Sequence, residues 1–309
     1  KPDQNLYSLT ASIINSLKPI LEEFLPNYVF IHGDTTTTMA SAISSFYSGT
    51  KVCHVEAGLR TNNKLSPFPE EINRQIAGRI CDYHFAPTET SKDNLLKENT
   101  PKSSILVTGN TVIDALFESI KRVKSYSSPA IENIHSNISN GQEIILVTAH
   151  RRENHGLGFE RICKALKKIA LEKPQIKIIY PTHLNPNVQE PVKRYLSGID
   201  NVLLIDPLSY PDFIWLMNKS KIIITDSGGV QEEAPSLGKP VLVMRDTTER
   251  PEAVEAGTVI LVGTDKNKIF SETIDLLNNQ KRFDNMSKLH NPYGDGLACS
   301  RIVTFIKNL

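Results

Sequence analysis

The chain has 309 residues, of which 39% are hydrophobic and 22% charged, and its 35 lysines and arginines nearly balance its 34 acidic residues. This length and composition indicate a globular protein with two domains, and the balanced charge excludes a general attraction to nucleic acid or to anionic membranes. No apolar run in the sequence reaches the length of a membrane span. The four widely spaced cysteines predict buried free thiols and hence a cytoplasmic protein, although the sequence is also compatible with a disulfide.

Residues 1–123 alternate between helical and strand-like patterns. Apolar residues at helical spacing predict a first helix over 6–24, which ends before Pro26. Short β-branched and aromatic runs then predict four strands, with helical patterns after them. We expect strands at 28–31, 51–55, 83–86 and 105–107, and helices at 39–47, from 69 onward, at 90–97 and at 111–123.

A change of composition separates this first domain from a second alternating series. Residues 124–142 are rich in Ser, Asn and Gly and predict a linker, followed by a second domain over 143–294. A last amphipathic helix is expected at 297–307, and we expect the segment 295–309 to pack back on the first domain. Within the second series we expect strands at 144–148, 176–180, 202–205, 222–225, 241–244 and 259–262, and helices at 158–170, 188–196, 212–218, 230–237 and 266–277.

Strand–helix alternation in both halves predicts an α/β fold. The expected architecture is two Rossmann-like, doubly wound parallel sheets with a cleft between the domains. In such folds, ligands bind outside the carboxyl ends of the strands. The residues at those ends are therefore the candidates for a site.

The stretch 221–240 carries a binding signal of this kind. A buried strand is broken by Asp-Ser-Gly-Gly before a short helix, which places free backbone N–H groups and a positive dipole end at the sheet edge. Gly228 and Gly229 allow a bulky anion to approach the main chain, and Ser227 adds a hydroxyl donor. Glu233 follows one turn later, where it can accept hydrogen bonds from a ribose diol. The alternative is an ordinary tight connection in which Ser227 only caps the helix.

Acidic residues stand at the predicted strand ends of the first domain, and basic ones at those of the second. Asp34, Glu56 and Glu70 form the acidic set, and His150 follows the first strand of the second domain. Carboxylates of this kind can serve as general acids and bases. Helix caps and structural ion pairs are the alternative for each residue, and Asp34 in particular could cap a helix through Thr37.

Several other site types lack sequence support. The chain has no glycine-rich dinucleotide fingerprint, no P-loop, no nucleophile elbow and no metal-ligand spacing of His and Cys. Dinucleotide, P-loop, nucleophile-elbow and metal-site interpretations therefore have no support from these motifs. The interpretation that remains is acid/base chemistry by carboxylates beside a bound diphosphate.

Eight motifs stand out along the chain. They are HGDTTTT (32–38), HVEAGLRT (54–61), PEEINR (69–74), TGNTVIDAL (108–116), AHRREN (149–154), TDSGGVQEEAPSLGKP (225–240), RDTTERPEAV (245–254) and NPYGDG (291–296). In this order, and over essentially the whole chain, they resemble the non-hydrolysing UDP-N-acetylglucosamine 2-epimerase family. The resemblance implies two Rossmann-like domains, as in glycosyltransferases of the B type, and a cytoplasmic homodimer. It implies interconversion of UDP-GlcNAc and UDP-ManNAc for bacterial surface polysaccharides, without a metal or a nicotinamide cofactor.

The resemblance also assigns roles to individual residues. It implies that Asp34, Glu56, Glu70 and His150 form the catalytic group. It places the uracil near Leu208 and Phe213, although an aromatic residue such as Phe213 would by itself indicate a core position. A contact at Leu208 would have to use the backbone, because its side chain cannot read a base edge. The diphosphate and ribose would be bound by Ser227, Gly228, Gly229, Arg250 and Glu233.

The resemblance is incomplete at the N-terminus. Family members begin with a strand that ends in Gly-Thr-Arg-Pro-Glu, whose Arg and a nearby Lys reach the phosphates. We expect this chain to lack that segment of roughly 60 residues, which leaves the first domain incomplete at its N-terminus.

Three other functions remain compatible with these residues. A glycosyltransferase of the same architecture would share the second domain but would need an acceptor site in the first. A hydrolysing relative would release free ManNAc. A non-catalytic nucleotide-sugar sensor would keep the anion-binding turn without needing all three acids.

Overall fold

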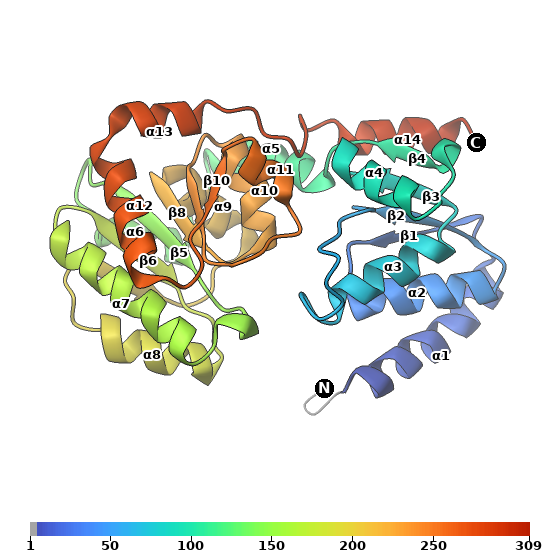
Figure 1. The fold of residues 1–309 in the computed structure, drawn as a ribbon, viewed down its shortest axis with the longest axis horizontal. Coiled ribbons are helices and arrows are strands. Elements are labelled where there is room, and N and C mark those ends of the chain that lie inside the picture. Colours follow the sequence, from blue (N-terminus) through green and yellow to red (C-terminus); the bar gives the residue numbers. More distant parts are fainter. Residues whose placement is uncertain (1–4) are drawn as a thin grey trace. The chain divides into compact units, whose positions relative to one another are not determined.

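Two parallel sheets organise the chain, and each belongs to its own unit (Figure 1). The computed structural model describes residues 5–309. The first unit runs up to Asp114 and includes Tyr293–Leu309, and the second is Ala115–Pro292. Two parallel sheets with alternating helices confirm the predicted α/β class. None of the helices within the described residues is long and apolar enough to cross a membrane.

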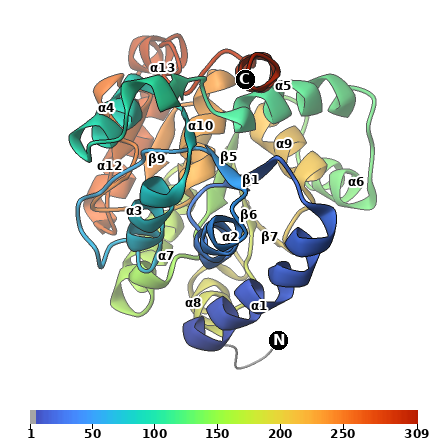
Figure 2. The same cartoon turned by 90° about the vertical axis from the view of Figure 1, so that its right-hand side faces the viewer.

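The first unit contains a four-stranded sheet in the order β1-β2-β3-β4. Its strands pair in parallel, with Ile31 opposite His54 and Val55 opposite Phe85. Helices α1, α2 and α3 pack on one another in sequence (Figures 1 and 2). The strands are β1 (Tyr28–His32), β2 (Lys51–Val55), β3 (Tyr83–Ala86) and β4 (Ile105–Val107), and the helices are α1 (Leu6–Phe24), α2 (Thr36–Tyr47), α3 (Glu70–Ile80), α4 (Glu89–Lys97) and the 3-10 turn η1 (Lys102–Ser104).

Helices pack on both faces of this sheet, but Phe30 of β1 remains 50% exposed. Ala42 of α2 and Ala77 of α3 pack on one face, together with Ile31 and Val52. The other face receives α14 (Ala298–Lys307). Phe305 of α14 packs edge-on against Phe85, with ring centroids 5.7 Å apart. The C-terminal helix therefore completes the first unit.

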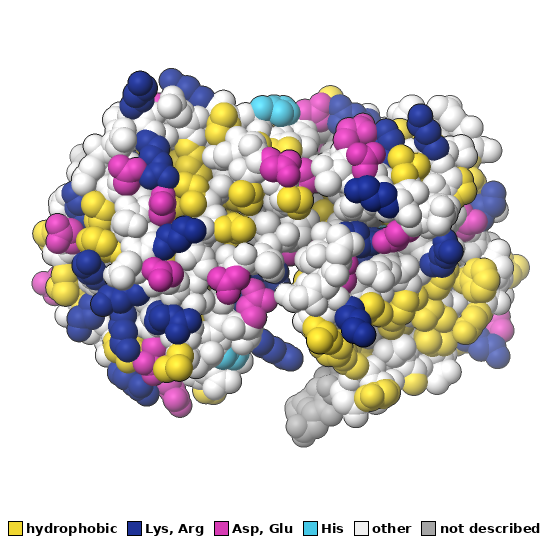
Figure 3. Space-filling model, in the orientation of Figure 1, with side chains coloured by type: hydrophobic (Ala, Val, Ile, Leu, Met, Phe, Trp, Pro, Cys, Tyr) yellow, Lys and Arg dark blue, Asp and Glu magenta, His cyan; other side chains and the backbone are white. Residues whose placement is uncertain are grey.

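Apolar side chains also remain on the outside of the first unit. Only Leu21 is buried among the residues of α1, whereas Phe24 and Leu25 are 77% and 76% exposed. Figure 3 shows hydrophobic side chains gathered on the surface around α1. Helix α1 is therefore less well covered than α2 and α3.

The second unit contains a six-stranded sheet in the order β10-β9-β8-β5-β6-β7. The chain builds β5, β6 and β7 in one direction and then returns to add β8, β9 and β10 on the other side. The strand order thus reverses between β5 and β8, and this is where doubly wound folds bind their ligands. The strands are β5 (Ile144–Thr148), β6 (Lys177–Pro181), β7 (Val202–Ile205), β8 (Ile222–Thr225), β9 (Val241–Val243) and β10 (Val259–Leu261).

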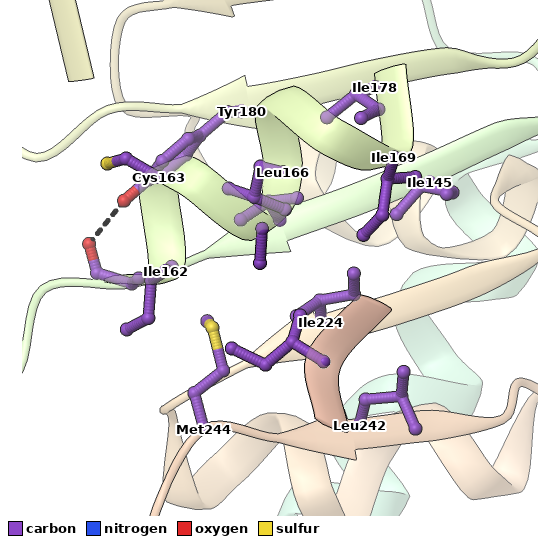
Figure 4. Packing of buried hydrophobic residues seen from close by; sticks show 14 of the residues in the cluster. Ile145, Ile162, Cys163, Leu166, Ile169, Ile178, Tyr180, Ile224, Leu242 and Met244 are labelled. Carbon is purple, nitrogen blue, oxygen red and sulfur yellow. Dashed lines mark hydrogen bonds between the residues drawn. The ribbon is translucent and has the colours of Figure 1, made fainter. Parts of the chain in front are cut away.

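The core of the second unit explains why its strands are continuous apolar runs. A sheet with helices on both faces buries both sets of alternating side chains. Ile145 and Ile178 from neighbouring strands pack with Leu166 and Ile169 of α7 (Figure 4). The helices and 3-10 turn are α5 (Thr111–Val123, which crosses the unit boundary), α6 (Pro129–Ser136), η2 (Arg152–Asn154), α7 (Leu157–Glu172), α8 (Pro186–Leu196), α9 (Tyr210–Lys219), α10 (Gly228–Ser236), α11 (Pro251–Glu255), α12 (Lys266–Asn278) and α13 (Gln280–Ser287).

The structure differs from the sequence prediction at residues 124–142. This segment, expected as a linker, contains the helix α6. Ile131 and Ile134 of α6 are buried, and the Ser128 hydroxyl donates to Asp212 of α9 at 2.6 Å. These contacts make the segment part of the second unit, and the boundary between the units lies earlier, within α5.

Candidate functional site

A buried carboxylate joins the two loops at the point where the second sheet reverses. Asp226 follows β8 and is completely buried. Its Oδ2 accepts hydrogen bonds from the backbone N–H groups of His150 at 2.9 Å and Arg151 at 2.8 Å, both in the loop after β5. The side chain of Asn154 donates to the same oxygen at 3.2 Å. Asp226 therefore fixes the loop that carries His150 to the turn that carries Ser227.

His150 presents its ring at this junction. Its Nδ1 lies 3.7 Å from Oδ1 of Asp226, an oxygen that is buried without a hydrogen-bond partner among the described residues. The ring stacks on that of His183, with centroids 5.4 Å apart. Partial burial lowers the pKa of His150, and the charges of His183 and Arg151 lower it further, against the opposing effect of Asp226.

The turn after β8 has the features of an anion site. Ser227 occupies the N-cap position of α10, but its hydroxyl caps no backbone group and has no partner within residues 5–309. The first N–H groups of a helix have no partners inside the helix, and they favour negative charge. The structure thus leaves a hydroxyl and the first helical N–H groups at one sheet edge.

Arg250 lies directly against this turn. A Cβ at Gly228 would come within 2.6 Å of its Nη1, so only glycine fits there without displacing the guanidinium. Its Nε donates to Glu232 at 2.5 Å, and its Nη1 donates to Glu249. Two carboxylates therefore balance the buried guanidinium.

The ion pairs extend beyond Arg250. Glu249 also accepts a hydrogen bond from Nη1 of the buried Arg245 at 2.8 Å, and Arg245 pairs with Glu153 of η2 at 3.0 Å. This chain of charges links the loop after β9 to the loop after β5. Sequence reasoning missed Glu232, Glu249 and Glu153, and only Glu249 had a usable signal, the charge alternation in RDTTER (245–250).

Glu233 points from α10 toward α9. It is 5% exposed, and its Oε1 accepts a hydrogen bond from the Tyr210 hydroxyl at 2.7 Å. Burial raises the pKa of Glu233 to about 7, although the hydrogen bond from Tyr210 acts in the opposite direction. Leu208 and Phe213 flank Tyr210 in sequence, and both are half-buried. The residues predicted for the nucleoside thus come from one segment and the facing helix.

The first unit holds the three predicted acids. Asp34 follows β1, and its Oδ2 accepts two hydrogen bonds from Arg74 of α3, from Nη2 at 2.7 Å and from Nε at 3.1 Å. It does not cap α2, because Thr35 occupies that position and binds the Thr38 N–H. The capping alternative for Asp34 is therefore wrong, and an ion pair with Arg74 takes its place.

Arg74 is itself held by a buried acid. Glu71 is fully buried and accepts from Nη1 of Arg74 at 2.8 Å and from the backbone N–H groups of Thr61 and Asn62 at 3.0 Å. Burial alone would raise the pKa of Glu71, but these hydrogen bonds outweigh it and hold the pKa below its usual value. Glu71 and Arg74 thus form a support for Asp34 that the sequence analysis did not identify.

Glu56 lies beside the turn that carries Asp34, and Glu70 lies on the helix that carries Arg74, the ion-pair partner of Asp34. Glu56 follows β2 with φ at 65°, and its Oε2 lies 3.1 Å from Nε2 of His32 and next to Gly33, the residue before Asp34. Glu70 begins α3 four residues before Arg74, so both face one side of that helix. The structure thus brings the three acids to one edge of the first sheet, and it places His150 and the turn residues in the second unit.

The described part of the chain contains no group of three or more His, Cys, Asp or Glu side chains arranged to hold a metal ion.

Comparison with known proteins identifies relatives over the full chain. Residues 1–307 match a family model described as UDP-N-acetylglucosamine 2-epimerase. The UDP-N-acetylglucosamine 2-epimerases of Escherichia coli K12 and Yersinia pestis are 56% and 54% identical, over 100% of this chain and 82% of each relative. A crystal structure of UDP-GlcNAc 2-epimerase from Neisseria meningitidis bound to UDP-GlcNAc is 48% identical and superposes with a TM-score of 0.95, covering 100% of this chain and 84% of that one.

Proposed function

This chain belongs to the UDP-N-acetylglucosamine 2-epimerase family, and we propose that it interconverts UDP-GlcNAc and UDP-ManNAc by eliminating and re-adding UDP. The observation that carries the proposal is the junction of β5 and β8, where Asp226 holds the His150 loop beside the unoccupied hydroxyl of Ser227 and the glycine turn. A diphosphate is the ligand that such a helix N-terminus favours.

Elimination makes the chemistry at carbon 2 feasible. No carbonyl group lies next to this carbon, so its proton is poorly acidic. Loss of the proton becomes possible if UDP leaves carbon 1 at the same time, while Ser227, Arg250 and His150 take up charge at the diphosphate. The proton and the leaving group are anti, so the base belongs on the face of the sugar opposite UDP.

Inversion needs a second acid/base group on the other face. The glycal formed by elimination must receive a proton at carbon 2 from that side while UDP returns to carbon 1. We assign these steps to Asp34, Glu56 and Glu70, which gather at one edge of the first sheet. Two or three carboxylates around one sugar are what this mechanism requires.

The nucleoside is assigned to the second unit. We place the uracil at Phe213 and at the backbone near Leu208, the ribose at Glu233, and the diphosphate at Ser227, Gly228, Gly229 and Arg250. We further propose that the enzyme is a cytoplasmic homodimer that supplies N-acetylmannosamine units for surface polysaccharides. Light scattering of the purified protein tests the dimer, and a monomer at micromolar concentration would contradict it.

Product analysis tests the reaction class. We expect the protein to convert UDP-GlcNAc into an equilibrium mixture with UDP-ManNAc, as separated by ion-exchange chromatography and identified by NMR. Free ManNAc and UDP as the main products would indicate a hydrolysing enzyme. Turnover only when a sugar acceptor is added would indicate a transferase, and tight UDP-GlcNAc binding without any product would indicate a sensor.

A further inference from the structure

Tyr210 is a residue to which the sequence analysis gave no role, although it contacts the proposed ribose-binding acid. It is the first residue of α9, and its hydroxyl donates to Oε1 of Glu233 on α10 at 2.7 Å. Tyr210 is 42% exposed as a residue, whereas Glu233 is 5% exposed. Tyr210 thus stands at the surface side of a buried carboxylate.

This hydrogen bond gives the two carboxylate oxygens of Glu233 different hydrogen-bonding environments. Oε1 is occupied by Tyr210, and Oε2 has no hydrogen-bond partner within residues 5–309. Oε2 lies along the first turn of α10, because a Cβ on Gly229 would stand 3.8 Å from it. The free oxygen is therefore directed toward the same end of the helix as the glycine turn.

A carboxylate held in this way is prepared to bind a ligand. An unrestrained glutamate loses rotamer freedom when it binds, and fixing it beforehand reduces that loss. A ribose presents two neighbouring hydroxyl donors, and hydrogen bonds to a charged acceptor are about twice as strong as neutral ones. A 2′-deoxyribose would leave part of this acceptor unpaired.

We propose that Tyr210 positions the Glu233 carboxylate for the ribose diol of the nucleotide, and that the pair selects ribonucleotides over 2′-deoxyribonucleotides. The inference rests on the proposed function, because it takes the nucleoside to bind beside α10. Tyr210 is a positioning residue that acts through Glu233.

The chain provides a matched control for this tyrosine. The Tyr195 hydroxyl donates to Oε2 of Glu160 at 3.0 Å, between α8 and α7. Tyr195→Phe thus removes the same kind of hydrogen bond from helices that carry none of the proposed nucleotide contacts. A general loss of stability from removing a tyrosine hydroxyl would affect both variants.

The test measures the dissociation constants of UDP and 2′-deoxy-UDP by calorimetry at pH 8. We expect the unmodified protein to prefer UDP by about tenfold or more, the scale of one hydrogen bond to a charged group. Tyr210→Phe should reduce this preference severalfold, and Tyr195→Phe should retain it. In the Glu233→Ala background, Tyr210→Phe should have no further effect on the preference.

The pH dependence of UDP binding gives a second readout. The groups facing the Glu233 carboxylate are the Tyr210 hydroxyl from α9 and, behind that hydroxyl, Ser119 from α5. Because the Tyr210 hydrogen bond lowers the pKa of Glu233, its loss should raise that pKa. The decline of UDP affinity on acidification should therefore begin at a higher pH in Tyr210→Phe than in Tyr195→Phe.

Two results would overturn the inference alone. One is an equal loss of affinity for UDP and 2′-deoxy-UDP in Tyr210→Phe, and the other is an unchanged preference together with an unchanged pH profile. Failure of the unmodified protein to bind UDP at all would instead overturn the proposed function, and the role of Tyr210 with it. UDP binding by the unmodified protein therefore distinguishes the two failures.

Discussion

Asp34, which we propose as an acid/base group, is also held in a structural ion pair. Its ion pair with the buried Arg74 would by itself explain the residue, and Glu71 fixes Arg74 from the other side. A carboxylate fixed by buried partners is also what acid/base catalysis needs, because its position relative to the substrate is then set in advance. Geometry alone allows both roles, so substitution must separate them.

We expect Asp34→Asn, Glu56→Gln and Glu70→Gln each to lower turnover by about two decades or more, the usual scale for a lost general acid or base. UDP affinity should stay nearly constant, because the proposed nucleotide contacts lie in the second unit. Steady-state kinetics and calorimetry measure the two quantities. Glu89→Gln is a suitable control, since Glu89 is exposed and pairs with Lys92 on the surface of α4. Near-normal turnover of a carboxylate variant would return that residue to a structural role.

Glu233 is expected to lower the stability of the protein at alkaline pH. Its pKa is raised from 4.5 to about 7 in the folded state, so the folded protein binds more protons than the unfolded chain between these values. Stability contributed by this group therefore falls as pH rises from 4.5 to 7. The full effect is roughly 3 kcal/mol above pH 7.

Glu233→Gln keeps the shape and the acceptor for Tyr210 but cannot ionise. We expect it to raise the melting temperature at pH 8 and to change it little near pH 5, while weakening UDP binding. Thermal unfolding at both pH values measures the difference. An identical change in melting temperature at the two pH values would show that the ionisation of Glu233 does not affect folding.

At the scale of elements, the buried strands were the most predictable parts. Runs such as Ile222–Thr225 are entirely apolar or β-branched because helices cover both faces of the second sheet, and the predicted bounds of this strand match. The short helices α6, α11 and α13 were missed. Each has eight residues or fewer and depends on tertiary contacts rather than on its own propensity.

For the candidate site, too, local sequence predicted some residues, whereas partners distant in the sequence could not be predicted. The glycine turn and Ser227 could be read from local sequence, because a strand, a turn and a helix follow one another. The partners of Asp34, Glu233 and Arg250 could not, because Arg74, Tyr210 and Glu232 are separated from them by 40, 23 and 18 residues. Spacing in sequence carries no signal for such pairs.

The glycine turn offers a matched pair of substitutions. A Cβ at Gly228 would clash with Nη1 of Arg250 at 2.6 Å, whereas at Gly229 the nearest atom would be 3.8 Å away. Gly228→Ala should therefore destabilise the protein by about 1–3 kcal/mol, the usual range for overpacking. Gly229→Ala should leave stability unchanged or slightly higher, because alanine favours helix. Thermal unfolding measures both, and equal effects would show that Arg250 can move away from the turn.

At the scale of the whole molecule, the proposed reaction requires both units. In this proposal, the first unit supplies three carboxylates on one sheet edge, and the second supplies the diphosphate turn, His150 and the nucleoside contacts. The sequence indicated this division through the motifs at strand ends, and the strand order of the second sheet explains why His150 and Ser227 meet, since β5 and β8 are neighbours. Composition and charge contributed only the exclusion of other classes of protein.

In the proposed mechanism, a carboxylate of the protein removes the proton at carbon 2 while UDP leaves carbon 1. The most direct measurement is the reaction of UDP-GlcNAc in deuterium oxide, followed by NMR and mass spectrometry of both nucleotide sugars. Because a protein acid/base exchanges its proton with solvent, we expect UDP-ManNAc and the recovered UDP-GlcNAc to carry deuterium at carbon 2. Epimerised product without deuterium at that position would contradict the account.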